Sequence, residues 1–174
     1  RYQQVTIFGD ALYGKQPFCA LVLRHGCNFI LVCKPESHPT LYEWLAGVEA
    51  AGDLQQFTIR RWNGRFHTVH TYRYANTVPL REGEDAVWVN WCELTITTET
   101  DGTILYRNAC ATQHHLDHTS VEAVVQAGRA RWNIANEHNN TLNTTGYHLE
   151  HHYGHGTQHL SAVLLTLNLL AFLF

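Results

Sequence analysis

The run Asn28-Phe29-Ile30-Leu31-Val32-Cys33 decides the fold class, because its apolar residues do not alternate with polar ones. A continuous apolar run of this length, bounded by Gly26 and by Lys34-Pro35, is typical of a strand buried on both faces of a sheet. Such strands occur mostly in sheets that are covered by helices on both sides. The run therefore predicts an α/β architecture.

The segments around this run complete a strand–helix pattern. An earlier apolar run, Val5–Phe8, predicts a strand that ends at Gly9-Asp10. Helices are predicted over Gln16–Arg24 and Pro39–Ala51, each with a proline at its start, where a missing N–H is harmless. Strand, helix, strand and helix at this spacing favour a parallel pair of strands.

The pattern changes near Gly52, where alternating strands and hairpin turns take over. Asn63-Gly64 is a strong hairpin signal. The predicted strand Val87–Thr98 has two apolar faces, and only Asn90 interrupts the second of them. The predicted strands are Phe57–Trp62, Arg65–Tyr74, Val87–Thr98 and Thr103–Asn108.

A helical period returns through Val121, Val124 and Val125. The terminal run Leu160–Phe174 is apolar but shorter than the about 20 residues that cross a bilayer, so it predicts a buried helix and no membrane partner. We expect one interrupted α/β domain with three parts: an α/β part over residues 1–52, an all-β insertion over residues 53–112, and a helical completion over residues 113–174.

Composition excludes two classes of protein. With 45% hydrophobic residues, 16% charged residues and a net charge of −3, the chain is neither a disordered tail nor a generic basic DNA-coating protein. Its five cysteines are odd in number and lack zinc-knuckle spacing, which favours buried reduced thiols of an intracellular protein. The chain has no methionine and begins at Arg1, so a processed product or a piece of a longer protein is expected.

Asp10 is the first candidate site residue, because it directly follows a predicted buried strand. Open α/β sheets place ligand-binding and catalytic groups at such strand ends. A carboxylate there can hold a hard divalent cation, and pairs of metal ions held by converging acids commonly cleave phosphodiesters. The plain alternative is a turn or cap residue, so the prediction depends on further acids that converge on Asp10.

Several blocks of the sequence point to one family. The stretch Arg129-Ala130-Arg131-Trp132-Asn133-Ile134-Ala135-Asn136-Glu137 resembles the Arg-Trp-x-Ile-Glu block of insertion-sequence DDE transposases. Further blocks resemble the same family in the expected order, over nearly the whole chain: Gly9-Asp10, residues 33–44, Val89-Asn90-Trp91, residues 146–151 and residues 159–172. The resemblance implies an RNase H-like fold, here incomplete, with an all-β insertion and C-terminal helices. It also implies DNA transposition by metal-dependent strand cleavage and transfer, with Mg²⁺ or Mn²⁺ as cofactor and the transposon ends as the DNA partner.

The resemblance also assigns roles, and two of the family's three acids are missing. It places Asp10 in the second acidic position, as a catalytic metal ligand; the first position would lie before Arg1, and the third falls on Ala135. Arg131 is implied to assist at the DNA phosphate, and a helix arginine in an ion pair is its open alternative. Helix geometry argues against Glu137 as a replacement, because residues two apart on a helix differ by about 200° around its axis; a helix-surface acid is the preferred interpretation, and substitution for the third acid is the open alternative.

Two further residues of the family's pattern are also lost. Gly128 stands where the resemblance implies a tyrosine, and Asn143 stands near an implied lysine. We therefore predict that this chain, a C-terminal fragment by the resemblance, is catalytically inactive by itself.

DNA contacts should appear as clustered basic side chains that displace counterions. Most of the candidates lie in the all-β part, and solvated strand faces are the alternative. The candidate DNA-binding residues are Arg60, Arg61, Arg65, Arg73 and Arg129.

A different class of function is suggested by histidines crowded near the C-terminus. The i,i+4 pairs among them suggest zinc, but glycines interrupt any helix there, so a structural turn is the preferred interpretation. The cluster comprises His148, His151, His152, His155 and His159. Three alternatives stay open: a transposase fragment, a non-catalytic DNA-binding or dimerising remnant of the same fold, and a zinc-binding module. The expected location is the bacterial cytoplasm, in association with the nucleoid, and a homodimer is a further partner hypothesis.

Overall fold

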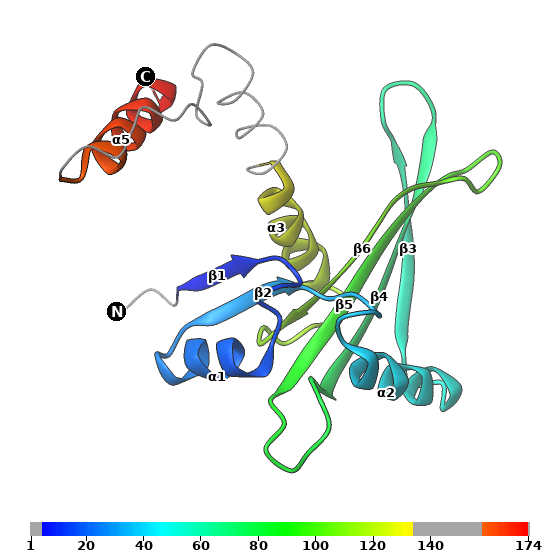
Figure 1. Ribbon diagram of the computed structural model, residues 1–174. Helices are drawn as coiled ribbons and strands as arrows, with labels where there is room; N and C mark the ends of the chain where they lie inside the picture. Colours follow the sequence, from blue (N-terminus) through cyan, green and yellow to red (C-terminus); the bar gives the residue numbers. More distant parts are fainter. Residues whose placement is uncertain (1–4, 134–157, 174) are drawn as a thin grey trace. The chain divides into compact units, whose positions relative to one another are not determined.

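A computed structural model describes residues 5–133 and 158–173. Its centre is a six-stranded mixed sheet with the strand order β1-β2-β6-β5-β4-β3 (Figure 1). The first two strands are parallel and all other neighbours are antiparallel. The strands are β1 (Thr6–Gly9), β2 (Asn28–Val32), β3 (Gln55–Trp62), β4 (His67–Pro79), β5 (Trp88–Thr98) and β6 (Ile104–Thr112). The predicted α/β class and the predicted parallel pair are confirmed.

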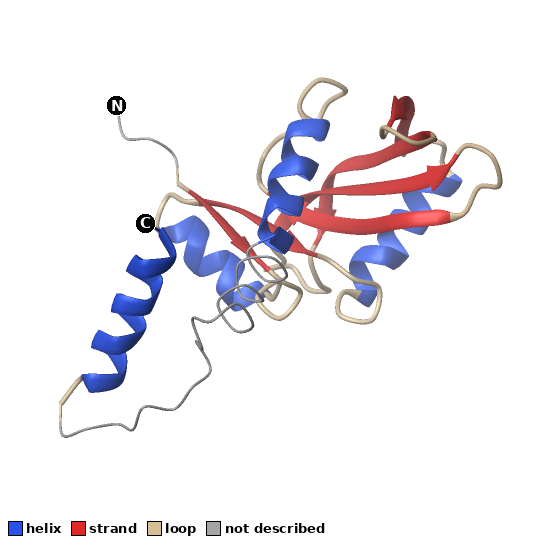
Figure 2. Cartoon of the chain, turned by 90° about the horizontal axis from the view of Figure 1, so that it is seen from above, coloured by secondary structure: helices blue, strands red, loops and turns tan. Residues whose placement is uncertain are grey.

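The two faces of the sheet carry separate apolar cores. Helices α1 (Gln16–Arg24) and α2 (Pro39–Ala50) cover one face, where Leu31 and Trp91 are buried. Helix α3 (Val121–Asn133) covers the other face, where Leu94 and the predicted helical residues 121, 124 and 125 are buried (Figure 2). Helices thus lie on both sides of β2, as its uninterrupted apolar sequence predicts.

The strands predicted as an insertion continue the same sheet. Strand β6 pairs with β2 through Ile30↔Thr112, Leu31↔Ala111 and Val32↔Cys110. The chain divides into two compact units, Arg1–Gly128 and Arg129–Phe174, and the whole sheet belongs to the first. The RNase H-like assignment and the interpretation of residues 53–112 as an insertion stay predictions.

Two details of the β-rich part differ from expectation. The hairpin at Asn63-Gly64 forms, but its loop has four residues between Trp62 and His67. The Asn63 carboxamide oxygen accepts the backbone N–H groups of residues 65 and 66, which stabilises the longer loop. Strand β4 also runs beyond Tyr74 to Pro79, past a register shift between Ala75 and Val78.

The last helix, α5 (Leu160–Leu173), forms where an apolar helix is predicted, but most of its described side chains are exposed. The predicted helix is confirmed, and its burial stays a prediction, because an apolar run predicts a helix without determining what covers it. No helix in the described ranges is long and apolar enough to span a membrane. The five cysteines are free thiols, and four of them are buried, as predicted.

Candidate functional site

Asp10 lies at the carboxyl end of β1, directly beside β2. Gly9 pairs with Leu31, and a Cβ at Gly9 would come within 2.8 Å of the Leu31 Cδ2 atom. Glycine at this position therefore leaves room for the Leu31 side chain, which a larger residue would have to displace. One carboxylate oxygen of Asp10 accepts the backbone N–H of Leu12 at 3.0 Å, which is the turn role weighed as the alternative.

His38 ties the loop that begins at Asp10 to the loop after β2. Its Nε2 atom lies 2.5 Å from the Gly14 carbonyl oxygen, and its Nδ1 atom lies 2.7 Å from the Ser37 hydroxyl. Burial lowers the pKa of His38, so the neutral imidazole is favoured, with Nε2–H donating to Gly14 and Nδ1 accepting from Ser37. His38 thereby fixes the end of the loop that follows Asp10.

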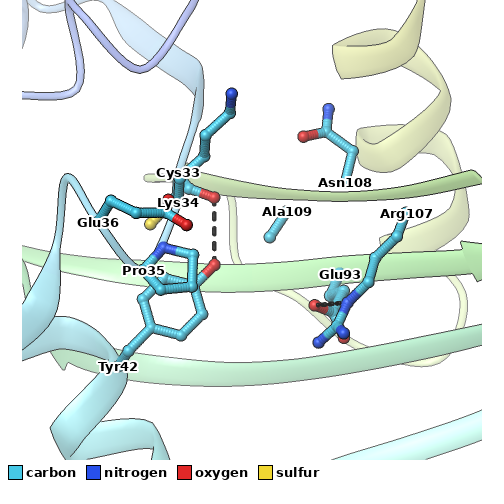
Figure 3. Close-up of a pocket in the computed structure, with 9 residues that line it drawn as sticks. All are labelled: Cys33, Lys34, Pro35, Glu36, Tyr42, Glu93, Arg107, Asn108 and Ala109. Carbon is cyan, nitrogen blue, oxygen red and sulfur yellow. Dashed lines mark hydrogen bonds and ion pairs between the residues drawn. The ribbon is translucent and has the colours of Figure 1, made fainter.

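A pocket of about 300 Å³, with both apolar and charged residues in its lining, opens at the end of β2. Figure 3 shows the Tyr42 hydroxyl aimed at the Cys33 carbonyl, to which it donates at 3.1 Å. Burial raises the pKa of the Cys33 thiol to about 12, so this thiol stays protonated and is not an activated nucleophile. The pocket is lined by Cys33, Lys34, Pro35, Glu36, Tyr42, Glu93, Arg107, Asn108 and Ala109.

Glu93 in this pocket is a buried carboxylate between two arginines. It is 5% exposed; one oxygen accepts the Arg107 Nε–H at 2.9 Å, and the other lies 3.4 Å from Arg73 Nη1. Arg73 also donates to Glu49 on α2 at 2.6 Å. Sequence reasoning missed this network, although an acid in line with Val89 and Trp91 on one strand face is a visible anomaly.

Among residues 5–133 and 158–173, the structure does not bring a set of acids to Asp10. In the part of the chain that it describes, no group of three or more histidine, cysteine, aspartate or glutamate side chains is arranged to hold a metal ion. Arg131 lies on α3, but its side chain and all of Ala135 and Glu137 are outside the described residues. The convergence of position 135 on Asp10 therefore stays a prediction.

Most of the predicted DNA-binding arginines have acidic partners. Arg60 makes a bidentate pair with Glu99 at 2.6 and 2.8 Å, Arg61 pairs with Glu122 of α3, and Arg73 pairs as described above. Arg65 at the β3–β4 hairpin has no acidic partner among the described residues. These partners are 20 to 61 residues away in the sequence, so the pairs become visible only when the strands and helices are packed together.

The remaining predicted residues lie near the C-terminus. Arg129 is on α3, at the start of the second compact unit. Of the histidine cluster, only His159 is described, so the zinc hypothesis falls outside the described residues. Comparison of the chain with protein-family models and with curated proteins finds no match.

Proposed function

We propose that this chain forms part of the catalytic region of an insertion-sequence DDE transposase, which cleaves and joins DNA strands. The observation that carries the proposal is the place of Asp10, at the carboxyl end of a strand that is parallel to its neighbour. This is where α/β sheets gather functional groups, and it is the position that the family resemblance implies for the second acid. The sequence blocks on both sides of Asp10 support the same assignment.

The free edge of the sheet also supports the proposal. Strand β1 ends the strand order, so its outer edge has no partner strand among the described residues. Val5 and Phe8 beside this edge are 57% and 43% exposed. A further strand that pairs here would satisfy the free backbone groups of the β1 edge and would lie next to Asp10, where the family resemblance implies the first acid.

The described residues do not by themselves fit a complete Mg²⁺ or Mn²⁺ site. Asp10 offers one carboxylate, one oxygen of which already accepts the Leu12 N–H, and a metal site of this kind needs several oxygen ligands. Ala135 contributes none. We therefore propose that Asp10 is a retained ligand of an incomplete site and that the chain alone does not cleave DNA. Arg131 is proposed to contact a DNA phosphate.

The pairing of the arginines narrows the proposed DNA contacts. Arg60, Arg61 and Arg73 have carboxylate partners that reduce their capacity to displace counterions from DNA. Arg65, beside the exposed Trp62, is the better candidate in the β-rich part. We propose that this hairpin contacts transposon ends, and Arg129 on α3 stays a separate candidate.

The test restores an acid at position 135 and asks whether any gain in metal binding depends on Asp10. Mn²⁺ binding is measured by calorimetry for the wild-type chain, for Ala135→Glu, and for Ala135→Glu combined with Asp10→Asn. Two converging carboxylates bind a divalent cation more tightly than one, so we expect Ala135→Glu to tighten binding at least about tenfold. We also expect the second change to abolish the gain. A gain that survives Asp10→Asn, or no gain at all, contradicts the proposed site, as does metal-dependent strand cleavage by the unaltered chain.

A non-catalytic DNA-binding or dimerising scaffold is the second candidate. It is favoured by the single acid that the described residues supply at the site. A gel shift with duplex DNA in EDTA, carried out for the wild type, Asp10→Asn and Arg65→Ala, separates the two functions. Metal-independent binding that Asp10→Asn leaves unchanged and Arg65→Ala weakens supports the scaffold.

A further inference from the structure

Two exposed tryptophans form a pair that joins α2 to the start of β5. Trp44 on α2 and Trp88 at the start of β5 are 48% and 47% exposed. Their ring centroids are 5.7 Å apart, with an angle of 83° between the planes. An edge-to-face pair holds both rings in a fixed orientation and leaves aromatic surface in contact with water. Exposed aromatic surface of this kind is enriched at sites of molecular recognition.

Trp44 also borders a groove of about 550 Å³ along the outer side of α2. The α2 groove is lined by Thr40, Glu43, Trp44, Gly47, Val48, Ala51 and Asp53. Gly47 leaves a gap in the helix surface, because nothing lies within 4 Å of the position that a Cβ there would occupy. The groove is thus open to a side chain that approaches from solvent and comes to rest against the Trp44 ring.

The charges in the α2 groove have a single sign. Glu43 and Asp53 are exposed, and neither carboxylate has a hydrogen-bond or ion-pair partner among the described residues. No lysine or arginine lines the groove. Glu49 on the same helix, in contrast, is paired with Arg73. Two unpaired carboxylates beside an exposed indole complement a cation, and they repel nucleic acid.

We propose that the α2 groove docks an arginine- or lysine-bearing segment of a partner protein. A cationic side chain of the partner lies against the Trp44 ring in the gap at Gly47, and Glu43 and Asp53 neutralise its charge. A planar guanidinium fits this arrangement best, because it stacks on an aromatic face and also donates to carboxylates. The proposal is independent of the transposase assignment, since no residue of the α2 groove takes part in the Asp10 site.

The probe is a fluorescent nonapeptide, Gly-Arg-Gly-Gly-Arg-Gly-Gly-Arg-Gly, and a matched peptide with citrulline in place of each arginine. Binding to the full 174-residue chain is measured by anisotropy at 50 mM and 500 mM NaCl. We expect the arginine peptide to bind at least about fivefold more tightly than the citrulline peptide and to lose most of this advantage at high salt. Equal binding of the two peptides, or no binding of either, refutes the proposal.

Variants identify the surface that binds. A Cβ at Gly47 meets no atom within 4 Å, and leucine favours a helix more than glycine does, so Gly47→Leu should preserve the fold while it occupies the groove and weakens binding at least about tenfold. Trp44→Ala should weaken binding about fivefold, and Glu43→Gln or Asp53→Asn about threefold each. Ala46→Leu, at an exposed position of α2 outside the groove, and Trp62→Ala, at a distant exposed tryptophan, are the controls and should leave binding unchanged.

A second copy of this chain is the competing occupant of the groove. Sedimentation of the wild type and of Gly47→Leu decides between the two occupants. Monomers in both cases are expected. If the wild type dimerises and Gly47→Leu abolishes the dimer, the proposal is overturned in favour of self-association. The proposal is also overturned if the two control variants lose as much peptide binding as the groove variants do.

Discussion

Replacement of Glu93 by glutamine tests the most deeply buried ion-pair network that the structure describes. The substitution keeps the size and one acceptor oxygen of the side chain but removes its charge. Glu93 lies at the centre of β5 with 6% of its side chain exposed, between Arg107 and Arg73. After the change, Arg73 keeps Glu49 as a partner, whereas Arg107 loses its only ion pair among the described residues.

The size of the effect follows from the burial of each partner. At an effective dielectric constant of about 20, attractions at 2.9 and 3.4 Å amount to about 5 kcal/mol each. Desolvation of the carboxylate offsets much of this, and breaking a buried pair typically costs about 3–5 kcal/mol. Because the Arg107 side chain is 56% exposed and regains water, we expect Glu93→Gln to lower the free energy of unfolding by about 2–3 kcal/mol.

Urea unfolding followed by tryptophan fluorescence and by circular dichroism measures this change. The matched control is Glu99→Gln, because Glu99 pairs with Arg60 on the same sheet but at the surface. The Arg60 hydrogen bond lowers the pKa of Glu99, yet water replaces the pair easily, so the control should unfold as the wild type does. If Glu93→Gln is no more destabilising than Glu99→Gln, burial does not strengthen the Glu93 network and the reasoning is wrong.

Three further predictions concern backbone strain, a side-chain amide and a histidine. Thr77 is β-branched with φ 60°, so Thr77→Gly should stabilise the protein by about 1 kcal/mol in urea unfolding; a loss of stability contradicts strain at this residue. The Asn90 side chain accepts the Thr77 N–H at 3.0 Å and donates to the His114 carbonyl at 2.9 Å. We therefore expect Asn90→Ala to lower the free energy of unfolding by about 2 kcal/mol, and an unchanged urea midpoint would contradict this role. Burial lowers the pKa of His38 below 6.5, so the unfolded chain binds a proton at this histidine more readily than the folded chain does. The contribution of His38 to the free energy of unfolding is therefore present above pH 6.5 and is lost as the pH falls toward the pKa of the folded state. Unfolding at pH 7.5 and 5.5 should show a smaller loss for His38→Gln than for the wild type; equal losses exclude a contribution from this histidine.

Local sequence signals predicted most elements, and they failed where a distant residue decides the geometry. The helix Gln16–Arg24 has the predicted bounds, because Pro17 marks its first turn and Gly26 at φ 69° follows its end. The end of β4 was missed, since its bulge is held by Asn90 on the neighbouring strand, 13 residues away. The same asparagine appeared in the sequence only as an interruption of an apolar face.

The candidate site, like the fold, could be predicted from the sequence only where local residues decide the geometry. The strand-end place of Asp10 follows from an apolar run before it and needs no knowledge of the sheet. The ring contact of Trp44 with Trp88, and the pairing of Glu93 with Arg107, join different elements and depend on how α2 and the strands pack. Sequence alone shows such residues as candidates and leaves their partners undetermined.

The distribution of charge in the described residues links the two proposals. Arginine and carboxylate are matched in pairs across the β-rich part, so much of its positive charge is neutralised within the protein. Affinity for a polyanion depends on cations that can displace its counterions, and internal pairs lower that number. The carboxylates of the α2 groove have no such partners. For a chain of net charge −3 arranged in this way, the proposed DNA contacts are local ones such as Arg65, whereas its unpaired acidic and aromatic surface suits the proposed basic protein segment. The proposed contact with transposon ends and the proposed contact with a partner protein therefore involve different surfaces of the described residues, and we expect substitutions to remove each without disturbing the other.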